Sequence, residues 1–139
     1  IIASRDWHDA DNDNGGHFAT WPVHCVAETT GAQYHPNLDQ SIIGLHIFKG
    51  QGAHGYSIFE GVTESGETIT DALRARGIDA VDVVGLATDH CVRASALDAK
   101  RAGLDVRVIS SLTAGVAAET TEKAIDELID AEVEVVPVV

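Results

Sequence analysis

The sequence predicts an α/β fold in which helices cover a central parallel sheet. Short apolar segments rich in β-branched residues alternate along the chain with amphipathic segments of helical periodicity. This alternation is typical of βαβ units, whose parallel strands are buried by helices on the faces of the sheet. The 139 residues are enough for a sizeable core, and no internal repeat or linker interrupts them. We therefore expect one α/β domain over residues 1–139.

The elements follow one another with short connections after the first forty residues. Apolar runs predict strands at 1–4, 45–49, 81–86, 105–109 and 133–138. Helical periodicity predicts helices at 68–76, from near Cys91 to Gly103, and at 119–131. Residues 110–116 are predicted to form a loop. Residues 5–40 show almost no periodicity, and so long an irregular segment inside a domain is usually functional.

Charge and cysteine content narrow the classes of partner. The net charge is −13, with 22 acidic side chains against 9 Lys and Arg, so the surface repels phosphate backbones and we expect no nucleic-acid partner. No apolar run approaches the length of a membrane span and no segment resembles a signal peptide, so we expect no membrane association. Cys25 and Cys91 could form one disulfide, but we expect two reduced thiols in a cytoplasmic protein.

Cys91 lies where a strand is predicted to turn into a helix. The run from Val81 to Val84 ends at Gly85, and helical spacing follows Cys91. Unpaired backbone N–H groups and the positive end of a helix lower a thiol pKa and favour the nucleophilic thiolate. The alternative at this position is a buried, unreactive cysteine of the core.

Four candidate metal ligands lie within the irregular segment. Asp6 and His8 project to the same side of an extended backbone, and His17 and His24 follow them. One carboxylate and three imidazoles suit a borderline divalent ion such as zinc, iron(II) or manganese. The alternative is that these histidines only make hydrogen bonds within the loop. Cys25, beside His24, is more typical of a small core residue than of a thiolate ligand.

Two familiar binding patterns are rejected. Residues 9–15 resemble a calcium loop, but the glycine stands one place late and Thr20 occupies the position of the required glutamate, which favours a solvated turn. Residues 50–55 match the dinucleotide pattern G-x-G-x-x-G, but no helical signal follows them.

Lys49 ends a predicted strand and so lies where parallel sheets bind their ligands. The long segment after residue 4 and the turn before Cys91 also begin at the carboxyl ends of strands. We expect all three to meet at one edge of the sheet, where the charge of Lys49 would favour a thiolate and stabilise an oxyanion. The alternative is a surface lysine whose stem covers apolar neighbours.

Five segments, in family order, resemble the nicotinamidase branch of the isochorismatase-like cysteine hydrolases. They are Asp6-Trp7-His8, Trp21-Pro22-Val23-His24-Cys25, Phe48-Lys49-Gly50, Tyr56-Ser57-Ile58-Phe59-Glu60-Gly61 and Gly85-Leu86-Ala87-Thr88-Asp89-His90-Cys91-Val92. The likeness continues through 112–116 to the final strand and covers essentially the whole chain. It implies a three-layer α/β/α fold and the hydrolysis of nicotinamide to nicotinate and ammonia, a reaction of NAD salvage.

The resemblance also implies a role for each matching residue. Cys91 matches the nucleophile and Lys49 the catalytic lysine, while the backbone N–H groups of Ala87 and Cys91 match the oxyanion hole, beside a cis peptide at Leu86–Ala87. Trp21 and Tyr56 match aromatic residues that flank the pyridine ring. One divalent metal is implied, which holds the ring nitrogen; its matching ligands are Asp6, His8, His17 and His24. The analogue pyrazinamide as a further substrate, and a homo-oligomer, are left open.

One residue of the family pattern has no match in the sequence. The third catalytic residue of the family is an aspartate at the end of a first strand, which would precede residue 1. We expect the full chain to carry that strand, its helix and this aspartate. Two other hypotheses are kept: a related hydrolase that acts on another amide or on isochorismate, and a non-catalytic metal-binding homologue. Bound metal would argue against isochorismate, because isochorismatases are not expected to need it.

Overall fold

The structure, a computed structural model, describes residues 1–138, and the chain divides into two compact units, Ile1–Ile69 and Thr70–Val139. Each unit has its own parallel sheet. Among the described residues, no helix is both long enough and apolar enough to cross a membrane. The predicted α/β class with parallel strands is confirmed.

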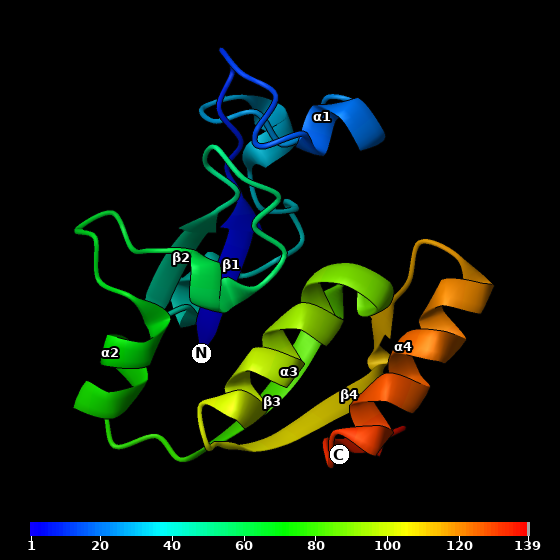
Figure 1. Cartoon of the computed structure of the whole chain (residues 1–139). Helices are drawn as coiled ribbons and strands as arrows, with labels where there is room; N and C mark the ends of the chain where they lie inside the picture. The colour runs from blue at the N-terminus through cyan, green and yellow to red at the C-terminus, as the bar shows by residue number, and fades with distance from the viewer. Residues whose placement is uncertain (139) are drawn as a thin grey trace. The chain divides into compact units, whose positions relative to one another are not determined.

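The first unit is built on two parallel strands, β1 (Ile2–Asp6) and β2 (Leu45–Lys49) (Figure 1). They pair from Ile2 opposite Leu45 to Asp6 opposite Lys49, so both strands end at the same edge. The long connection between them holds one short helix, α1 (His17–Thr20), and two 3-10 turns, η1 (Thr30–Ala32) and η2 (Gln40–Ile42). A third turn, η3 (Ile58–Glu60), follows β2, and no helix begins at the glycine pattern of residues 50–55.

The interior of the first unit is unusually polar. Ile47 is fully buried, and so are His8, Asn14 and Ser57, while Lys49 is only 3% exposed. Burying such groups is costly unless each finds a hydrogen-bond or ionic partner. An interior of this composition indicates a site for chemistry or binding rather than a simple packing core.

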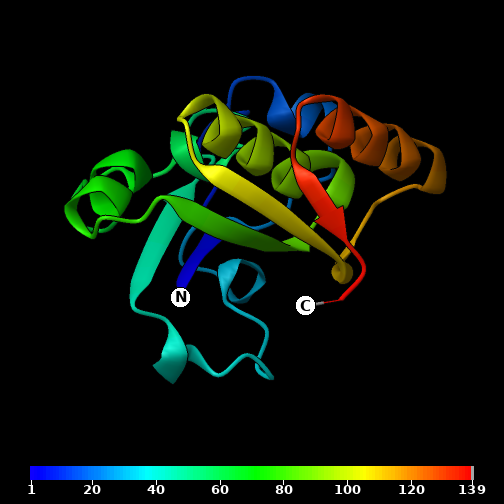
Figure 2. The same cartoon turned by 90° about the horizontal axis from the view of Figure 1, so that it is seen from below.

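The second unit is a three-stranded parallel sheet in the order β3-β4-β5, with strands β3 (Ala80–Leu86), β4 (Asp105–Ala114) and β5 (Glu134–Val136). A turn of π-helix, η4 (Thr88–Val92), leads from β3 into α3 (Arg93–Arg101). Helix α4 (Ala118–Asp130) connects β4 to β5, and α2 (Ile69–Ala75) precedes β3. Helices α3 and α4 cover the same face of the sheet (Figure 2).

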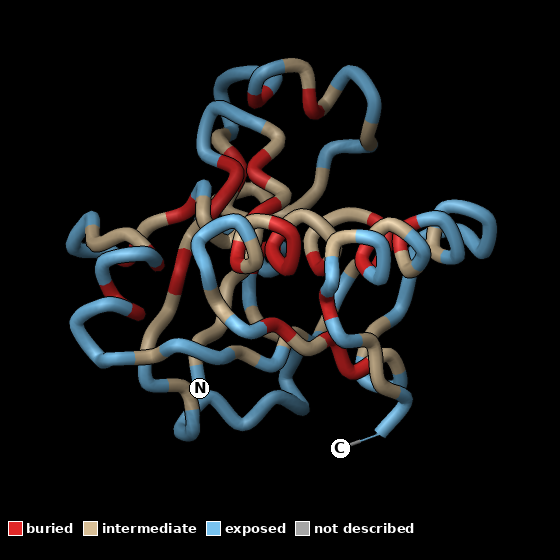
Figure 3. The backbone as a smooth tube through the Cα atoms, turned by 60° about the horizontal axis from the view of Figure 1, so that its bottom comes forward, coloured by how far each residue is buried: buried red, intermediate tan, exposed pale blue. Residues whose placement is uncertain are grey.

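The core of the second unit is apolar and lies between this helix layer and the sheet. Buried residues are drawn in red in Figure 3. Buried apolar side chains come from η4, α3, β4, α4 and the residue before β5: Val92, Ala96, Leu97, Ala99, Val106, Val108, Ile109, Ala124, Leu128 and Val133. Ala72 and Leu73 of α2 are buried as well. Arg93 of α3 and Glu127 of α4 form a bidentate ion pair, with N–O distances of 2.5 and 2.6 Å. The helices are thus joined to the sheet by packing and to each other by charge.

Most predicted elements are confirmed within two residues, but one boundary was wrong. Residues 110–116 were predicted to be a loop, whereas β4 continues to Ala114. A bulge between Val83 and Gly85 lets the ends of β3 and β4 pair, with Gly85 opposite Thr113. Backbone pairing needs no apolar side chain, so the sequence pattern of these residues does not indicate a strand. The helix expected from Cys91 begins instead as the π-helical turn, and α3 starts at Arg93.

Asp89 joins the turn after β3 to the start of α4. Its carboxylate accepts hydrogen bonds from the backbone N–H groups of Val116 and Ala117 at 3.0 and 3.3 Å, and from the Thr120 hydroxyl at 2.5 Å. Burial raises the pKa of Asp89, but these hydrogen bonds outweigh it and lower the pKa from 3.8 to about 2. Asp89 therefore serves as a cap for a helix that begins with no side-chain cap of its own.

We expect Asp89→Asn to lower the free energy of unfolding by about 2 kcal/mol at neutral pH. This is the free energy that corresponds to the lowered pKa of the Asp89 carboxyl. Because the native pKa is the lower one, the contribution is complete above the unfolded pKa of 3.8 and disappears as the pH falls towards 2. Urea unfolding of both proteins between neutral pH and pH 2 measures it. A difference between them that stays constant over this range would contradict the prediction.

Candidate metal centre and nucleophile turn

The parallel register of the first unit places Asp6 next to Lys49 at the carboxyl ends of β1 and β2. The Lys49 ammonium donates to Asp6 Oδ1 at 2.5 Å and to the Gly55 carbonyl at 3.0 Å. Since Lys49 is only 3% exposed, the alternative of a surface lysine is wrong. The lysine is instead held in the interior as a counter-charge to the carboxylate.

His8 lies on the same side of the backbone as Asp6, as the spacing predicts. The His8 Nε2 atom lies 3.9 Å from Asp6 Oδ2. Backbone hydrogen bonds from His8 to Cys25 (2.9 Å) and from Ala27 to His8 (2.8 Å) then tie a distant part of the loop alongside it. This pairing brings His24 next to His8, with ring centroids 5.1 Å apart.

The three loop histidines each use Nδ1 for a hydrogen bond and turn Nε2 inward. His8 Nδ1 lies 2.8 Å from the Gly50 carbonyl, and His24 Nδ1 lies 2.6 Å from the Pro22 carbonyl. His17, at the start of α1, contacts His54 through Nδ1 at 2.9 Å. The Nε2 atoms of His17 and His24 approach to 3.3 Å. One nitrogen of each ring is thus fixed by the protein, and the other faces a shared point.

This cluster fits a divalent metal. The ligand atoms of His8, His17 and His24 lie within 4.8 Å of one another, and Asp6 belongs to an overlapping group with His24 and Cys25. His8 Nε2 is buried and has no hydrogen-bond partner among residues 1–138. Burial, together with the neighbouring histidines, lowers the pKa of His17 from 6.5 to about 4, so its imidazole is neutral, as ligation requires. The alternative, that these histidines only stabilise the loop, leaves the shared orientation of Nε2 unexplained.

Trp21 and Tyr56 border the histidine cluster. The Trp21 indole donates to the Tyr56 hydroxyl at 2.9 Å, and the His17 ring lies 6.1 Å from Trp21 and 5.8 Å from Tyr56 between centroids. Aromatic faces beside a metal cluster suit a flat heteroaromatic ligand. Their part in binding a substrate ring stays a prediction.

Two residues that organise this centre were missed by sequence reasoning. Asn14 is fully buried, and its Oδ1 accepts from Asp9 at 2.8 Å and from Gly52 at 3.1 Å, which joins the turn before α1 to the loop after β2. The turn was predicted to be solvated, and it is, apart from this side chain. His54, the partner of His17, lies in a glycine-rich loop and carries no local signal of its role.

The second unit places Cys91 in the turn that follows β3. The peptide bond between Leu86 and Ala87 is cis, as the resemblance implies. The Ala87 carbonyl accepts from His90 at 3.1 Å and from Val92 at 3.0 Å, which closes the π-helical turn around Cys91. Single π-helical turns are frequent at functional sites. Cys91 is partly exposed and forms no disulfide among the described residues, which favours a reactive over an inert core cysteine; Cys25 forms no disulfide there either.

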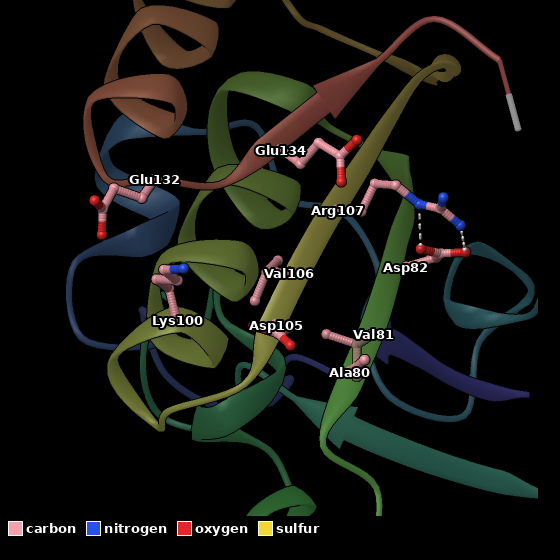
Figure 4. A pocket seen from close by; sticks show the side chains of 9 residues that line it. All are labelled: Ala80, Val81, Asp82, Lys100, Asp105, Val106, Arg107, Glu132 and Glu134. Carbon is pink, nitrogen blue, oxygen red and sulfur yellow. Dashed lines mark hydrogen bonds and ion pairs between the residues drawn. The ribbon is translucent and has the colours of Figure 1, made fainter.

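The second unit also has a pocket, at the opposite end of its sheet. It lies at the beginning of β3 and β4, where Ala80 and Asp105 start their strands (Figure 4). Arg107 in its wall is already paired with Asp82, with two N–O distances of 2.8 Å. Ligands of parallel sheets bind at the other, carboxyl ends of the strands, where Cys91 lies. None of the predicted site residues lines this pocket.

Comparison with known proteins gives a consistent result. The Isochorismatase domain family matches residues 1–138. The nicotinamidase/pyrazinamidase of Mycobacterium tuberculosis is 49% identical, over 98% of this chain and 75% of its own length. The pyrazinamidase of Pyrococcus horikoshii, solved in complex with zinc, is 33% identical with a TM-score of 0.81, over 98% of this chain and 74% of that one. The L. infantum protein PnC1, solved with nicotinate, is 33% identical with a TM-score of 0.84, over 97% and 70%.

Gly50→Ala is expected to weaken zinc binding by about tenfold or more, the range seen when the support of a metal ligand is removed. A Cβ at Gly50 would lie 2.6 Å from Cε1 and 2.8 Å from Nδ1 of the buried His8 ring. Competition with a chromophoric chelator measures the affinity.

Gly66→Ala is the matched control. Gly66 has φ +84° against +83° for Gly50, so both variants carry the same left-handed strain, but a Cβ at Gly66 meets no atom within 4 Å. Equal zinc affinities for the two variants would contradict the assignment of His8 as a ligand.

Proposed function

The chain belongs to the isochorismatase family, in its nicotinamidase branch, and we propose that it hydrolyses nicotinamide to nicotinate and ammonia. The observation that carries the proposal is the convergence of His8, His17 and His24 beside the aromatic pair Trp21 and Tyr56. A metal centre next to two aromatic faces suits a ring that offers a basic nitrogen. The 49% identity to a nicotinamidase/pyrazinamidase supports the same substrate class.

The resident metal of the proposal is one divalent ion held by Asp6, His8, His17 and His24. Three imidazoles and a carboxylate suit zinc, and zinc is the metal of the P. horikoshii complex. Iron(II) and manganese accept the same donors and stay open. When bound, the metal supplies an electron-pair acceptor for the ring nitrogen of the substrate.

The residues of the chain then have separate roles in the reaction. Trp21 and Tyr56 flank the pyridine ring and set its plane. Cys91 attacks the carboxamide carbon as a thiolate, favoured by the helix that begins just after it. The backbone N–H groups of Ala87 and Cys91, with the ammonium of Lys49, stabilise the negative charge on the carboxamide oxygen.

The reaction proceeds through a thioester. The Cys91 sulfur forms a bond to the carbonyl carbon, and the C=O electron pair moves to oxygen. When the carbonyl reforms, the C–N bond breaks, and the amine leaves as ammonia with the proton that the thiol gave up. Water adds to the thioester, the C–S bond breaks, and nicotinate, the thiol and one proton are released; the departed ammonia can take up that proton. No net oxidation or reduction occurs.

Pyrazinamide is proposed as a second substrate. Its ring, like that of nicotinamide, is a flat nitrogen heterocycle with a carboxamide, so the same aromatic pair and metal can hold it. A relative with 49% identity is named for both amides. Isochorismate has no nitrogen heterocycle and no carboxamide, so it lacks the two groups for which this site is proposed. We place the enzyme in the cytoplasm, because a thiol nucleophile must stay reduced.

Cys91→Ala is expected to abolish ammonia release from nicotinamide. Losing a single oxyanion donor typically costs about 10²–10³ in rate, and losing the nucleophile should cost more. Zinc content and urea unfolding of the variant, both unchanged, serve as controls for the metal centre and the fold. Release within tenfold of wild type would refute the covalent route.

Removal of the metal is expected to abolish hydrolysis and to leave Cys91 alkylation by iodoacetamide measurable, because the nucleophile turn lies on other elements than the ligands. Dialysis against a chelator, followed by addition of zinc, iron(II) or manganese one at a time, identifies the ion that restores ammonia release. Full activity of the metal-free protein would contradict the role of the histidine cluster.

A further inference from the structure

His54 contacts the metal centre without belonging to it. It lies in the loop between β2 and η3 and comes from none of the positions that the family resemblance matches to a ligand, a nucleophile or an aromatic wall. It is also outside the groups of residues whose ligand atoms converge. Its ring is partly buried and packs against two members of the site, His17 and Tyr56.

The contact with His17 fixes which nitrogen of that ring faces the cluster. The two Nδ1 atoms lie 2.9 Å apart, so one of them donates a hydrogen bond through its N–H and the other accepts it. If His17 binds a metal through Nε2, its proton must sit on Nδ1, which then donates to the Nδ1 lone pair of His54. His8 and His24 reach the same state by bonding to carbonyl oxygens of Gly50 and Pro22. His54 supplies to His17 what the backbone supplies to the other two ligands.

The contact with Tyr56 ties the same side chain to the aromatic pair. The rings of His54 and Tyr56 are stacked, with centroids 5.5 Å apart and planes at 27°. The Tyr56 hydroxyl in turn accepts from the Trp21 indole at 2.9 Å. One imidazole therefore braces a metal ligand on one side and a wall of the ring site on the other.

We propose that His54 is a positioning residue that accepts a hydrogen bond from His17 Nδ1 and so orients His17 Nε2 towards the metal. The inference rests on the metal centre of the proposed function. Outer partners of ligating histidines typically change metal affinity by about 10- to 100-fold when they are removed. We expect an effect of this size at His54, although it touches no metal itself.

The test measures zinc affinity of the full chain by chelator competition, with cobalt(II) absorption as a second readout of ligand geometry. His54→Phe keeps a ring to stack on Tyr56 but has no acceptor, and should weaken zinc binding by about 10- to 100-fold. His54→Gln can still accept from His17 through its amide oxygen, and should restore much of the affinity. The control is His35→Phe, at an exposed histidine whose ring accepts a hydrogen bond from the nearby Asn37 amide.

Each outcome decides the proposal. Weak binding in His54→Phe, with recovery in His54→Gln and a wild-type value in His35→Phe, supports it. Equal affinities for His54→Phe and wild type overturn it, and so do equal losses in His54→Phe and His54→Gln, or in His54→Phe and His35→Phe. A rise in KM for nicotinamide at unchanged zinc affinity overturns it as well, and would make His54 a substrate contact. Failure of the wild type to bind zinc would instead overturn the metal centre, whereas zinc binding without ammonia release would count against the proposed reaction alone.

Discussion

A buried imidazole nitrogen that has no hydrogen-bond partner among residues 1–138 is the constraint on which the first unit depends. His8 is fully buried, its Nδ1 is held by the Gly50 carbonyl, and no residue from 1 to 138 bonds its Nε2. A buried polar atom left in this state costs about 1–3 kcal/mol. The neighbouring side chains are arranged so that a ligand can remove this cost: a carboxylate lies 3.9 Å away, and two further imidazoles turn the same nitrogen inward. The histidine cluster is therefore a preformed site.

The two units differ in the composition of their interiors. In the second unit, aliphatic side chains of α3, α4 and the sheet make the core, and the polar chemistry is concentrated in the turn that carries Cys91. In the first unit, polar side chains occupy the interior itself, and their mutual hydrogen bonds replace much of the apolar packing. Metal binding is expected to contribute to the stability of the first unit, because a bound metal ion would accept the lone pairs of the buried histidine nitrogens.

A feature of the structure can be predicted from this sequence when residues close together in the chain determine it. The strand at 45–49 has the predicted bounds, because a run of apolar residues indicates it. Asp6 and His8 lie on one side of the backbone, because successive side chains of an extended segment point to alternate sides. Lys49 was placed at a strand end by the same local reasoning. The extension of β4 to Ala114 has no apolar pattern and depends on a bulge in its neighbour. Asn14 and His54 act through residues about forty positions away, 38 from Asn14 to Gly52 and 37 from His54 to His17, and no local pattern reports such contacts.

The family resemblance supplied what spacing could not. The joint role of His17 and His24 requires the loop to fold back so that Cys25 and Ala27 bond to His8, and no periodicity in residues 5–40 announces that pairing. The function of the turn at Cys91 likewise came from its match to a family segment, while its π-helical form was visible only in the structure. The single-domain organisation, and the meeting of both units at one edge, stay predictions.

The bond network of Asp89 has a consequence for local opening. Because the Asp89 carboxylate accepts hydrogen bonds from the N–H groups of Val116 and Ala117, the turn that carries Cys91 and the start of α4 are held by the same side chain. Segments that are held by the same side chain open together, and their amide hydrogens exchange with solvent at correlated rates. Motion of Cys91 is thereby tied to the fraying of a helix that begins more than two dozen residues later in the sequence, at Ala118. Changes at that helix end are therefore expected to alter the environment of the Cys91 thiol without touching it.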